Sequence, residues 1–162
     1  MRALDFLNVY QTDSFVQTLA EGVRTSKQST LHIKGVHGSL DSVLFGAVYN
    51  TSRATHLVIV EDKEEASYLF NDLQNLLGNK EILFYPMSYK RPYEYDETEN
   101  SNILMRAEVL NQLSGHPNSQ IIVTYPEALS EKVITKKSLI SNTFLVKVGE
   151  ALDREFLEEF LH

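Results

Sequence analysis

Two glycines, Gly35 and Gly38, stand between an apolar run and a predicted helix, the position of phosphate-binding loops in α/β proteins. Glycines let backbone N–H groups turn toward an anion, and the N-terminus of the next helix adds positive potential. Triphosphate chemistry also needs a lysine soon after the second glycine and then a hydroxyl for Mg²⁺. At those places the chain has Ser39, Leu40, Asp41 and Ser42. We therefore predict a degenerate nucleotide loop that binds no ATP or other cofactor, formed by Gly35, Val36, His37, Gly38 and Ser39.

The remaining polar residues near this turn do not form a recognisable catalytic set. His37 has no acidic or histidine partner at ligand spacing, so we interpret it as a turn residue. His32 and His56 flank predicted strands and are interpreted as structural. Ser39 and Ser42 lack the sequence around a nucleophile elbow and are predicted to cap a helix. The chain has no cysteine, which excludes a thiolate site. We predict no catalytic residue and no metal site.

The segment 86–100 has neither helical nor strand periodicity and is predicted to be a long surface loop. Tyrosine and arginine are common in binding hot spots. The candidate interaction surface is Tyr89, Arg91, Tyr93 and Tyr95. These side chains could equally pack the loop onto its own domain, and the sequence does not decide between the two. The acidic residues Glu94, Asp96, Glu97 and Glu99 lack the spacing of a calcium loop and are interpreted as a solvated run. Arg106 could pair with one of these carboxylates.

The composition is that of a globular protein with an acidic surface. The 162 residues carry a formal net charge of −7 and are 43% hydrophobic. Such a charge opposes a broad nucleic-acid surface, because phosphate binding needs clustered lysine and arginine. No apolar run has the length of a membrane span. A cytoplasmic location, without a membrane partner, fits the cysteine count and the absence of a secretory signal.

Strands and helices alternate along the chain, which predicts an α/β fold with a doubly wound, mostly parallel sheet flanked by helices. The predicted strands are 31–36, 56–60, 82–85 and 120–124. The predicted helices are 13–24, one starting at Ser39 or Ser42, one that follows a capping box of Asp62 and Glu65 and ends at Gly78, 101–114, and one from Pro126 to near Val133. In the helix 101–114 the inward residues are predicted to be Ile103, Ala107, Leu110 and Leu113.

The domain boundaries are predicted from changes in this pattern. We assign a helical N-terminal segment to 1–29, a degenerate phosphate-loop, helicase-like domain to 30–140, and the beginning of a truncated second α+β domain to 141–162. The last region contains an alternating strand at 143–148 and a helix capped by Asp153. This strand and helix have little chain to pack against, which suggests that a second domain continues beyond them.

The order of these pieces resembles the first domain of excinuclease B, the helicase-like component of the bacterial excision-repair nuclease. It is still more similar to the N-terminal region of the bacterial transcription-repair coupling factor family. The resemblance spans residues 30–162 and depends on the order of several short motifs. They are Gly35–Ser39, Leu57–Asp62 with Glu65-Ala66 and Asp72-Leu73, Phe84-Tyr85-Pro86, Tyr89 with Arg91-Pro92-Tyr93, Arg106 with Leu110, Ile122-Val123-Thr124 with Ala128-Leu129, and Val148-Gly149 with Leu152-Asp153.

This resemblance implies a non-catalytic module that helps to recruit excinuclease A, another component of the nuclease, for transcription-coupled nucleotide excision repair. It implies that the main recruiting surface lies in the second domain, of which only residues from about Phe144 are present. Further domains of the family hydrolyse ATP, translocate on DNA and displace stalled RNA polymerase, and their motifs are absent here. We therefore expect the chain to contact excinuclease A weakly, and the rest of its own protein. We expect it to reach DNA and polymerase only through downstream domains.

Two other functions remain open at this stage. One is a nucleotide hydrolase with an atypical phosphate loop. The other is a single-strand nucleic-acid binder that stacks bases on Tyr89 and Tyr93. The excinuclease B domain carries a long aromatic hairpin that clamps DNA, and the chain has no room for one between Pro92 and Ser101. The carboxylates in that interval would repel phosphates, so we expect no DNA clamp.

Overall fold

The computed structural model describes residues 3–25, 30–52, 54–78, 82–89, 99–115 and 119–141, together with positions 144, 146, 148–149, 151, 153 and 155. The chain divides into two compact units, 1–132 and 133–162. The elements of the first unit are α1 (Ala3–Gln11), α2 (Ser14–Thr25), α3 (Leu40–Ser52), β1 (His56–Ile59), α4 (Lys63–Leu77), β2 (Ile82–Phe84), α5 (Asn100–Gly115), β3 (Ile121–Thr124) and α6 (Pro126–Ser130). The second unit contains α7 (Lys136–Ser141), which the sequence analysis did not predict.

Three parallel strands form the sheet, in the order β1-β3-β2. Leu57 and Leu83 both lie opposite Ile122, so the strands share one register. All four residues of β3 are buried, as expected for a central strand covered on both faces. The structure confirms an α/β fold with a parallel sheet, and it confirms three of the four predicted strands to within a residue.

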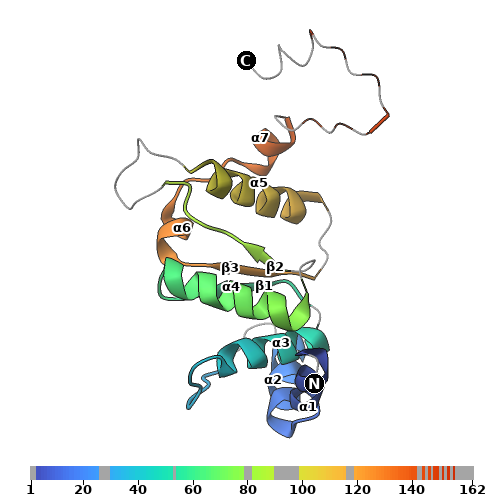
Figure 1. The fold of residues 1–162 in the computed structure, drawn as a ribbon, viewed down its shortest axis with the longest axis vertical. Coiled ribbons are helices and arrows are strands. Elements are labelled where there is room, and N and C mark those ends of the chain that lie inside the picture. The colour runs from blue at the N-terminus through green and yellow to red at the C-terminus, as the bar shows by residue number, and fades with distance from the viewer. Residues whose placement is uncertain are drawn as a thin grey trace. The chain divides into compact units, whose positions relative to one another are not determined.

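The helices α4 and α5 cover opposite faces of this sheet (Figure 1). Consecutive residues of a strand point to opposite faces. The Phe84 ring meets Phe70 of α4 at 5.3 Å between centroids, whereas the next residue, Tyr85, lies under the Arg106 guanidinium of α5 at 4.2 Å. The sheet is therefore sandwiched between helices where β2 and β3 run.

The boundaries of α4 follow from its sequence. The Asp62 carboxylate accepts a hydrogen bond from the Glu65 amide at 2.8 Å, and the Glu65 carboxylate accepts from the Glu61 amide at 2.9 Å. The bond to Asp62 is one half of the predicted capping box, whereas the Glu65 carboxylate accepts from Glu61, one residue before the N-cap, and not from Asp62. The helix ends at Gly78, whose φ of 85° favours glycine.

A second core lies beside the sheet, where α1 and α2 pack against α3. Its buried residues are Leu7, Val16, Val43 and Ala47. Gly46 permits this close approach, because a Cβ at that position would lie 3.3 Å from a methyl carbon of Leu7. The helix α2 confirms the predicted helix 13–24 to within a residue, and Asp13 caps it by accepting from the Phe15 amide.

The predicted strand 31–36 is wrong as a strand of this sheet. The segment forms no strand, and its backbone makes no hydrogen bond within the described part of the chain. Instead, Leu31 packs on α2, where its Cδ1 lies 3.0 Å from the place that a Cβ on Gly22 would occupy. The apolar side chains of the segment line a groove against α2 and α3 rather than an interior between two layers. Apolar content alone could not distinguish these two destinations.

Two further predictions differ from the structure or lie beyond it. The helix from Pro126 ends at Ser130 rather than near Val133. The predicted strand 143–148 and the final helix fall mostly outside the described residues. In that region the Asp153 carboxylate accepts a hydrogen bond from the Glu155 amide at 2.9 Å, the contact expected of a helix cap.

Candidate functional site

The glycine turn before α3 has the backbone shape that its two glycines allow. Gly35 has a φ of 80° and Gly38 a φ of 59°, both in the region that disfavours other residues. The helix α3 begins two residues after Gly38, so the turn delivers the chain to a helix N-terminus. The geometry of a turn followed by a helix is therefore as predicted.

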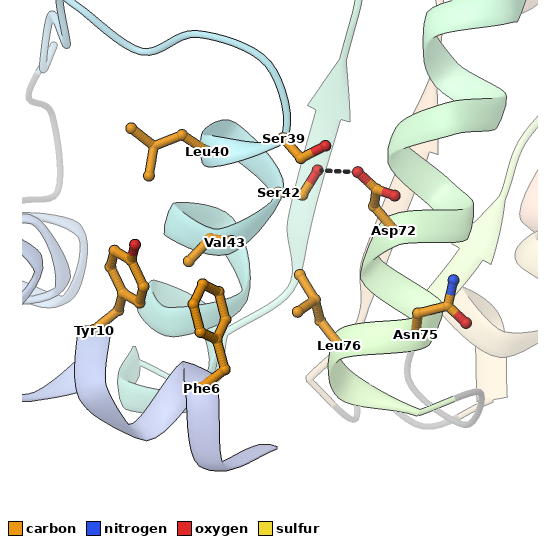
Figure 2. A pocket seen from close by; sticks show the side chains of 9 residues that line it. All are labelled: Phe6, Tyr10, Ser39, Leu40, Ser42, Val43, Asp72, Asn75 and Leu76. Carbon is orange, nitrogen blue, oxygen red and sulfur yellow. Dashed lines mark hydrogen bonds between the residues drawn. The ribbon is translucent and has the colours of Figure 1, made fainter. Parts of the chain in front are cut away.

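The first turn of α3 uses its polar groups internally. The Ser42 amide donates to the Asp41 carboxylate at 2.6 Å, and the Ser42 hydroxyl, only 2% exposed, donates to the Asp72 carboxylate of α4 at 3.1 Å (Figure 2). A hydroxyl that is to hold Mg²⁺ must have a lone pair directed at the ligand site. Here the Ser42 hydroxyl is buried and joins α3 to α4 instead.

A cleft of about 400 Å³ lies between the glycine turn and α4. Residues 36–39 line one side and Tyr68 and Leu69 line the other. Three carboxylates, those of Asp41, Glu65 and Asp72, complete its lining, and none of the described residues that line it is a lysine or arginine. A triphosphate placed there would meet negative charge in a site where catalysis needs cations.

A second cleft, of about 450 Å³, lies on the other side of Ser42 (Figure 2). The rings of Phe6 and Tyr10 meet edge to face at 5.1 Å along α1, and Leu76 of α4 lies across from them. Asn75 and Asp72 provide the polar groups at its α4 side. The shared wall of the two clefts is thus the Ser42–Asp72 hydrogen bond.

Only one residue of the predicted interaction surface falls in the described chain. Tyr89 is half-buried at the end of the segment 82–89. Arg91, Tyr93 and Tyr95 lie outside the described residues, and so do the acidic residues Glu94, Asp96 and Glu97. The two ends of the loop are held together, because the Glu99 amide donates to the Ser88 carbonyl at 2.8 Å.

A buried cluster around Arg106 anchors this loop to the domain. Arg106 is 6% exposed, and its Nη1 donates to the carbonyls of Pro86 at 2.8 Å and Ala128 at 3.1 Å. The same nitrogen lies 3.5 Å from the Glu131 carboxylate, which also accepts from the amide and hydroxyl of Ser88. Among the described residues, the carboxylate paired with Arg106 is therefore that of Glu131. Pairing with Glu94, Asp96 or Glu97 stays a prediction, because these residues lie outside the described chain.

This cluster also explains why the inward face of α5 differs from the predicted one. The structure buries Asn102, Arg106 and Val109, whereas Ile103 and Leu113 are exposed. Leu110 packs against the core as predicted. The Asn102 amide donates to the Met87 carbonyl at 2.9 Å, next to the bonds made by Arg106. Polar contacts to the chain after β2 thus rotate the helix by about one residue from the orientation that its apolar pattern favours.

His56 begins β1 beside α3. Its Nε2 is 3.3 Å from the Ser52 hydroxyl, and its ring meets the Tyr49 ring edge to face at 5.7 Å. Burial lowers the pKa of His56 below its usual value, since desolvation disfavours the charged imidazole. Among the described residues, no group of three or more His, Asp or Glu is placed to hold a metal ion.

These features define a parallel α/β domain with a glycine turn before its third helix and an acidic cleft at that turn. No family model matches the chain. The chain is similar to the transcription-repair-coupling factor of Rickettsia typhi, with 29% identity over 89 residues. The match covers 55% of this chain and 8% of the relative, so the chain corresponds to a small part of that protein. No described helix is long and apolar enough to cross a membrane.

Proposed function

We propose that the chain is a non-catalytic interaction module that acts in transcription-coupled nucleotide excision repair. The proposed role is to support recruitment of excinuclease A. The proposal that the module is non-catalytic rests on the residues at the glycine turn. Asp41 stands where a phosphate loop needs a cation, and the Ser42 hydroxyl is committed to Asp72. The similarity to a transcription-repair-coupling factor supports the choice of pathway.

The charges that line the cleft at the glycine turn oppose the binding of a triphosphate. In a phosphate loop the lysine and Mg²⁺ neutralise the charge that develops during phosphoryl transfer. The cleft at the glycine turn has Asp41, Glu65 and Asp72 in their place. Like charges at close range raise the free energy of the bound state, and no lysine or arginine among the described lining residues offsets them. We therefore expect the turn to serve as a structural link between α3 and α4.

Calorimetry with ATP and Mg²⁺ tests the non-catalytic part. We expect no binding heat at micromolar to millimolar nucleotide with the parent chain. An Asp41→Asn variant, which removes the charge at nearly constant shape, serves as a comparison and should bind weakly at most. Micromolar affinity in the parent, lost on substitution of His37 or Ser39, would refute the proposal.

Recruitment is tested with purified excinuclease A by biolayer interferometry. We compare residues 1–162 with the full-length product of the gene. Weak binding by 1–162 and clear binding by the full-length product are expected, because the recruiting surface is proposed to lie in the second domain. Absence of binding by the full-length product would exclude the recruiting role, while tight binding by 1–162 would place the surface in this chain.

The tyrosine loop gives a matched pair of variants for the same measurement. One variant replaces Tyr89, Arg91, Tyr93 and Tyr95 by alanine. The control is Tyr68→Ala, because Tyr68 is 67% exposed on α4 and is not part of the loop sequence. A loss of affinity in the loop variant alone would assign the loop to the interface. Equal affinities would favour the alternative that the loop packs on its own domain.

A further inference from the structure

We propose that the cleft between α1, α3 and α4 (the apolar cleft) is a docking site for a basic peptide segment. The segment carries a large apolar side chain and, at short spacing, an arginine. The apolar side chain occupies the apolar cleft, and the arginine enters the neighbouring cleft at the glycine turn (the acidic cleft). The site and its ligand class go beyond the proposed function and do not depend on excinuclease A, so the recruitment experiment above and the experiment below can fail separately.

The apolar cleft, of about 450 Å³, is lined mainly by side chains that are only half-buried. Phe6, Tyr10 and Leu76 pack against the second core but remain partly exposed where they line the cleft (Figure 2). Leu40, also half-buried, and Val43 add to this lining from α3. A large apolar side chain placed here removes this lining from water, which is the dominant favourable term in most protein associations.

The two clefts are direct neighbours, because Ser39, Ser42 and Asp72 line both. Figure 2 shows Ser39 and the Ser42–Asp72 hydrogen bond at the edge of the apolar cleft. One short peptide segment can therefore reach both clefts. In an extended segment the side chains of every second residue point to the same side. We therefore expect one residue between the apolar anchor and the arginine.

The carboxylates of the acidic cleft have no cationic partner among the described residues. Asp41 accepts from the Ser42 amide, Glu65 from the Glu61 amide and Asp72 from the Ser42 hydroxyl, and all three donors are neutral. No ion pair joins these carboxylates to a described side chain. An ionised carboxylate can accept several hydrogen bonds, so acceptors remain for the planar fork of a guanidinium.

The surroundings of the carboxylates favour an arginine segment over other occupants. Tyr68 lines the acidic cleft and is 67% exposed, and a guanidinium can stack on the face of such a ring. The formal net charge of −7 opposes a nucleic acid or an anionic lipid surface. A second copy of the chain carries the same negative charge. A basic segment with an apolar anchor is therefore the occupant that complements both clefts.

Titration followed by NMR tests the site with the 162-residue chain and a synthetic probe, acetyl-Phe-Gly-Arg-amide. Two control peptides each remove one feature. Acetyl-Phe-Gly-citrulline-amide replaces the arginine by a neutral isostere, and acetyl-Gly-Gly-Arg-amide lacks the apolar anchor. We expect the probe to shift the amide resonances of residues that line both clefts, and each control peptide to bind about tenfold more weakly. Unshifted lining residues at millimolar probe, or equal affinity for either control peptide, would overturn the proposal.

A pair of charge variants separates the local carboxylates from the overall charge. Asp41→Asn/Glu65→Gln keeps the side-chain oxygens that accept backbone hydrogen bonds and should bind the probe about tenfold more weakly. Glu21→Gln/Glu108→Gln neutralises two exposed carboxylates that line neither cleft, and should bind as the parent does. Equal losses in both variants would overturn the site. Shifts of the lining residues that grow with protein concentration, without probe, would assign the apolar cleft to a second copy and overturn it too.

Discussion

Two polar clusters of the first unit differ in how completely their groups are paired. At the Arg106 cluster, a buried guanidinium contacts two carbonyls and the Glu131 carboxylate. At the glycine turn, Asp41 and Asp72 share one hydroxyl and face an open cleft. The first cluster fixes the orientation of a helix against the sheet. The second joins two helices and leaves a negatively charged surface. Carboxylates therefore stabilise packing at the Arg106 cluster, whereas at the glycine turn they also give the cleft its negative charge.

The largest expected effect comes from breaking the Arg106 cluster. Arg106→Met should reduce the free energy of unfolding by about 3–5 kcal/mol, because it leaves Glu131 as a buried charge without its cation. Urea unfolding followed by circular dichroism measures this. The companion variant Arg106→Met/Glu131→Leu removes both charges and should recover part of the loss. An effect of Arg106→Met below about 1 kcal/mol would mean that the cluster is solvated.

A smaller effect is expected from Tyr125, which supports the same loop. Its hydroxyl accepts a hydrogen bond from the Met87 amide at 2.9 Å, and burial raises the pKa of this phenol. Tyr125→Phe leaves that amide without a partner and should reduce stability by about 1–3 kcal/mol. Tyr68→Phe, at an exposed tyrosine, is the matched control and should change little. Equal effects of the two substitutions would contradict the proposed role of the Tyr125 hydroxyl.

The N-terminal turns of α3 and α4 each contain an aspartate that accepts a backbone hydrogen bond, and we expect the two to contribute differently to stability. Asp62 caps α4 through the Glu65 amide, so Asp62→Ala should reduce stability by about 1 kcal/mol. Asp41 bonds the amide of the next residue in the first turn of α3 and lies near Asp72 across Ser42. Asp41→Ala should therefore have a smaller effect, because it also removes a repulsion. Thermal unfolding of both variants at the same pH and salt decides the order, and a larger loss in Asp41→Ala would reverse it.

The sequence predicted regular elements well where a local pattern determines them. The Asp62 side-chain cap of α4 and the apolar run of β3 are both found in the structure. The inward face of α5 could not be predicted, because Arg106 is buried by partners at Pro86, Ala128 and Glu131, which are distant in sequence. The position of segment 31–36 could not be predicted from the sequence either, because its apolar residues suit a strand and a groove equally. The acidic character of the cleft at the glycine turn was predictable only in part. Asp41 is local to the turn, whereas Glu65 and Asp72 reach it through the packing of α4.

The smallest expected effect is the pH dependence contributed by His56. Burial lowers its pKa in the folded state, so below the usual value of about 6.5 the unfolded chain binds the proton more readily. The contribution of His56 to stability is therefore fully present above pH 6.5 and is lost progressively as the pH falls toward the lowered pKa.

His56→Gln retains a polar group near Ser52 and removes this titration. Urea unfolding between pH 5 and 7.5 should give a shallower stability profile for the variant than for the parent. Parallel profiles for the parent and His56→Gln would show that the imidazole is as well solvated in the folded chain as in the unfolded one.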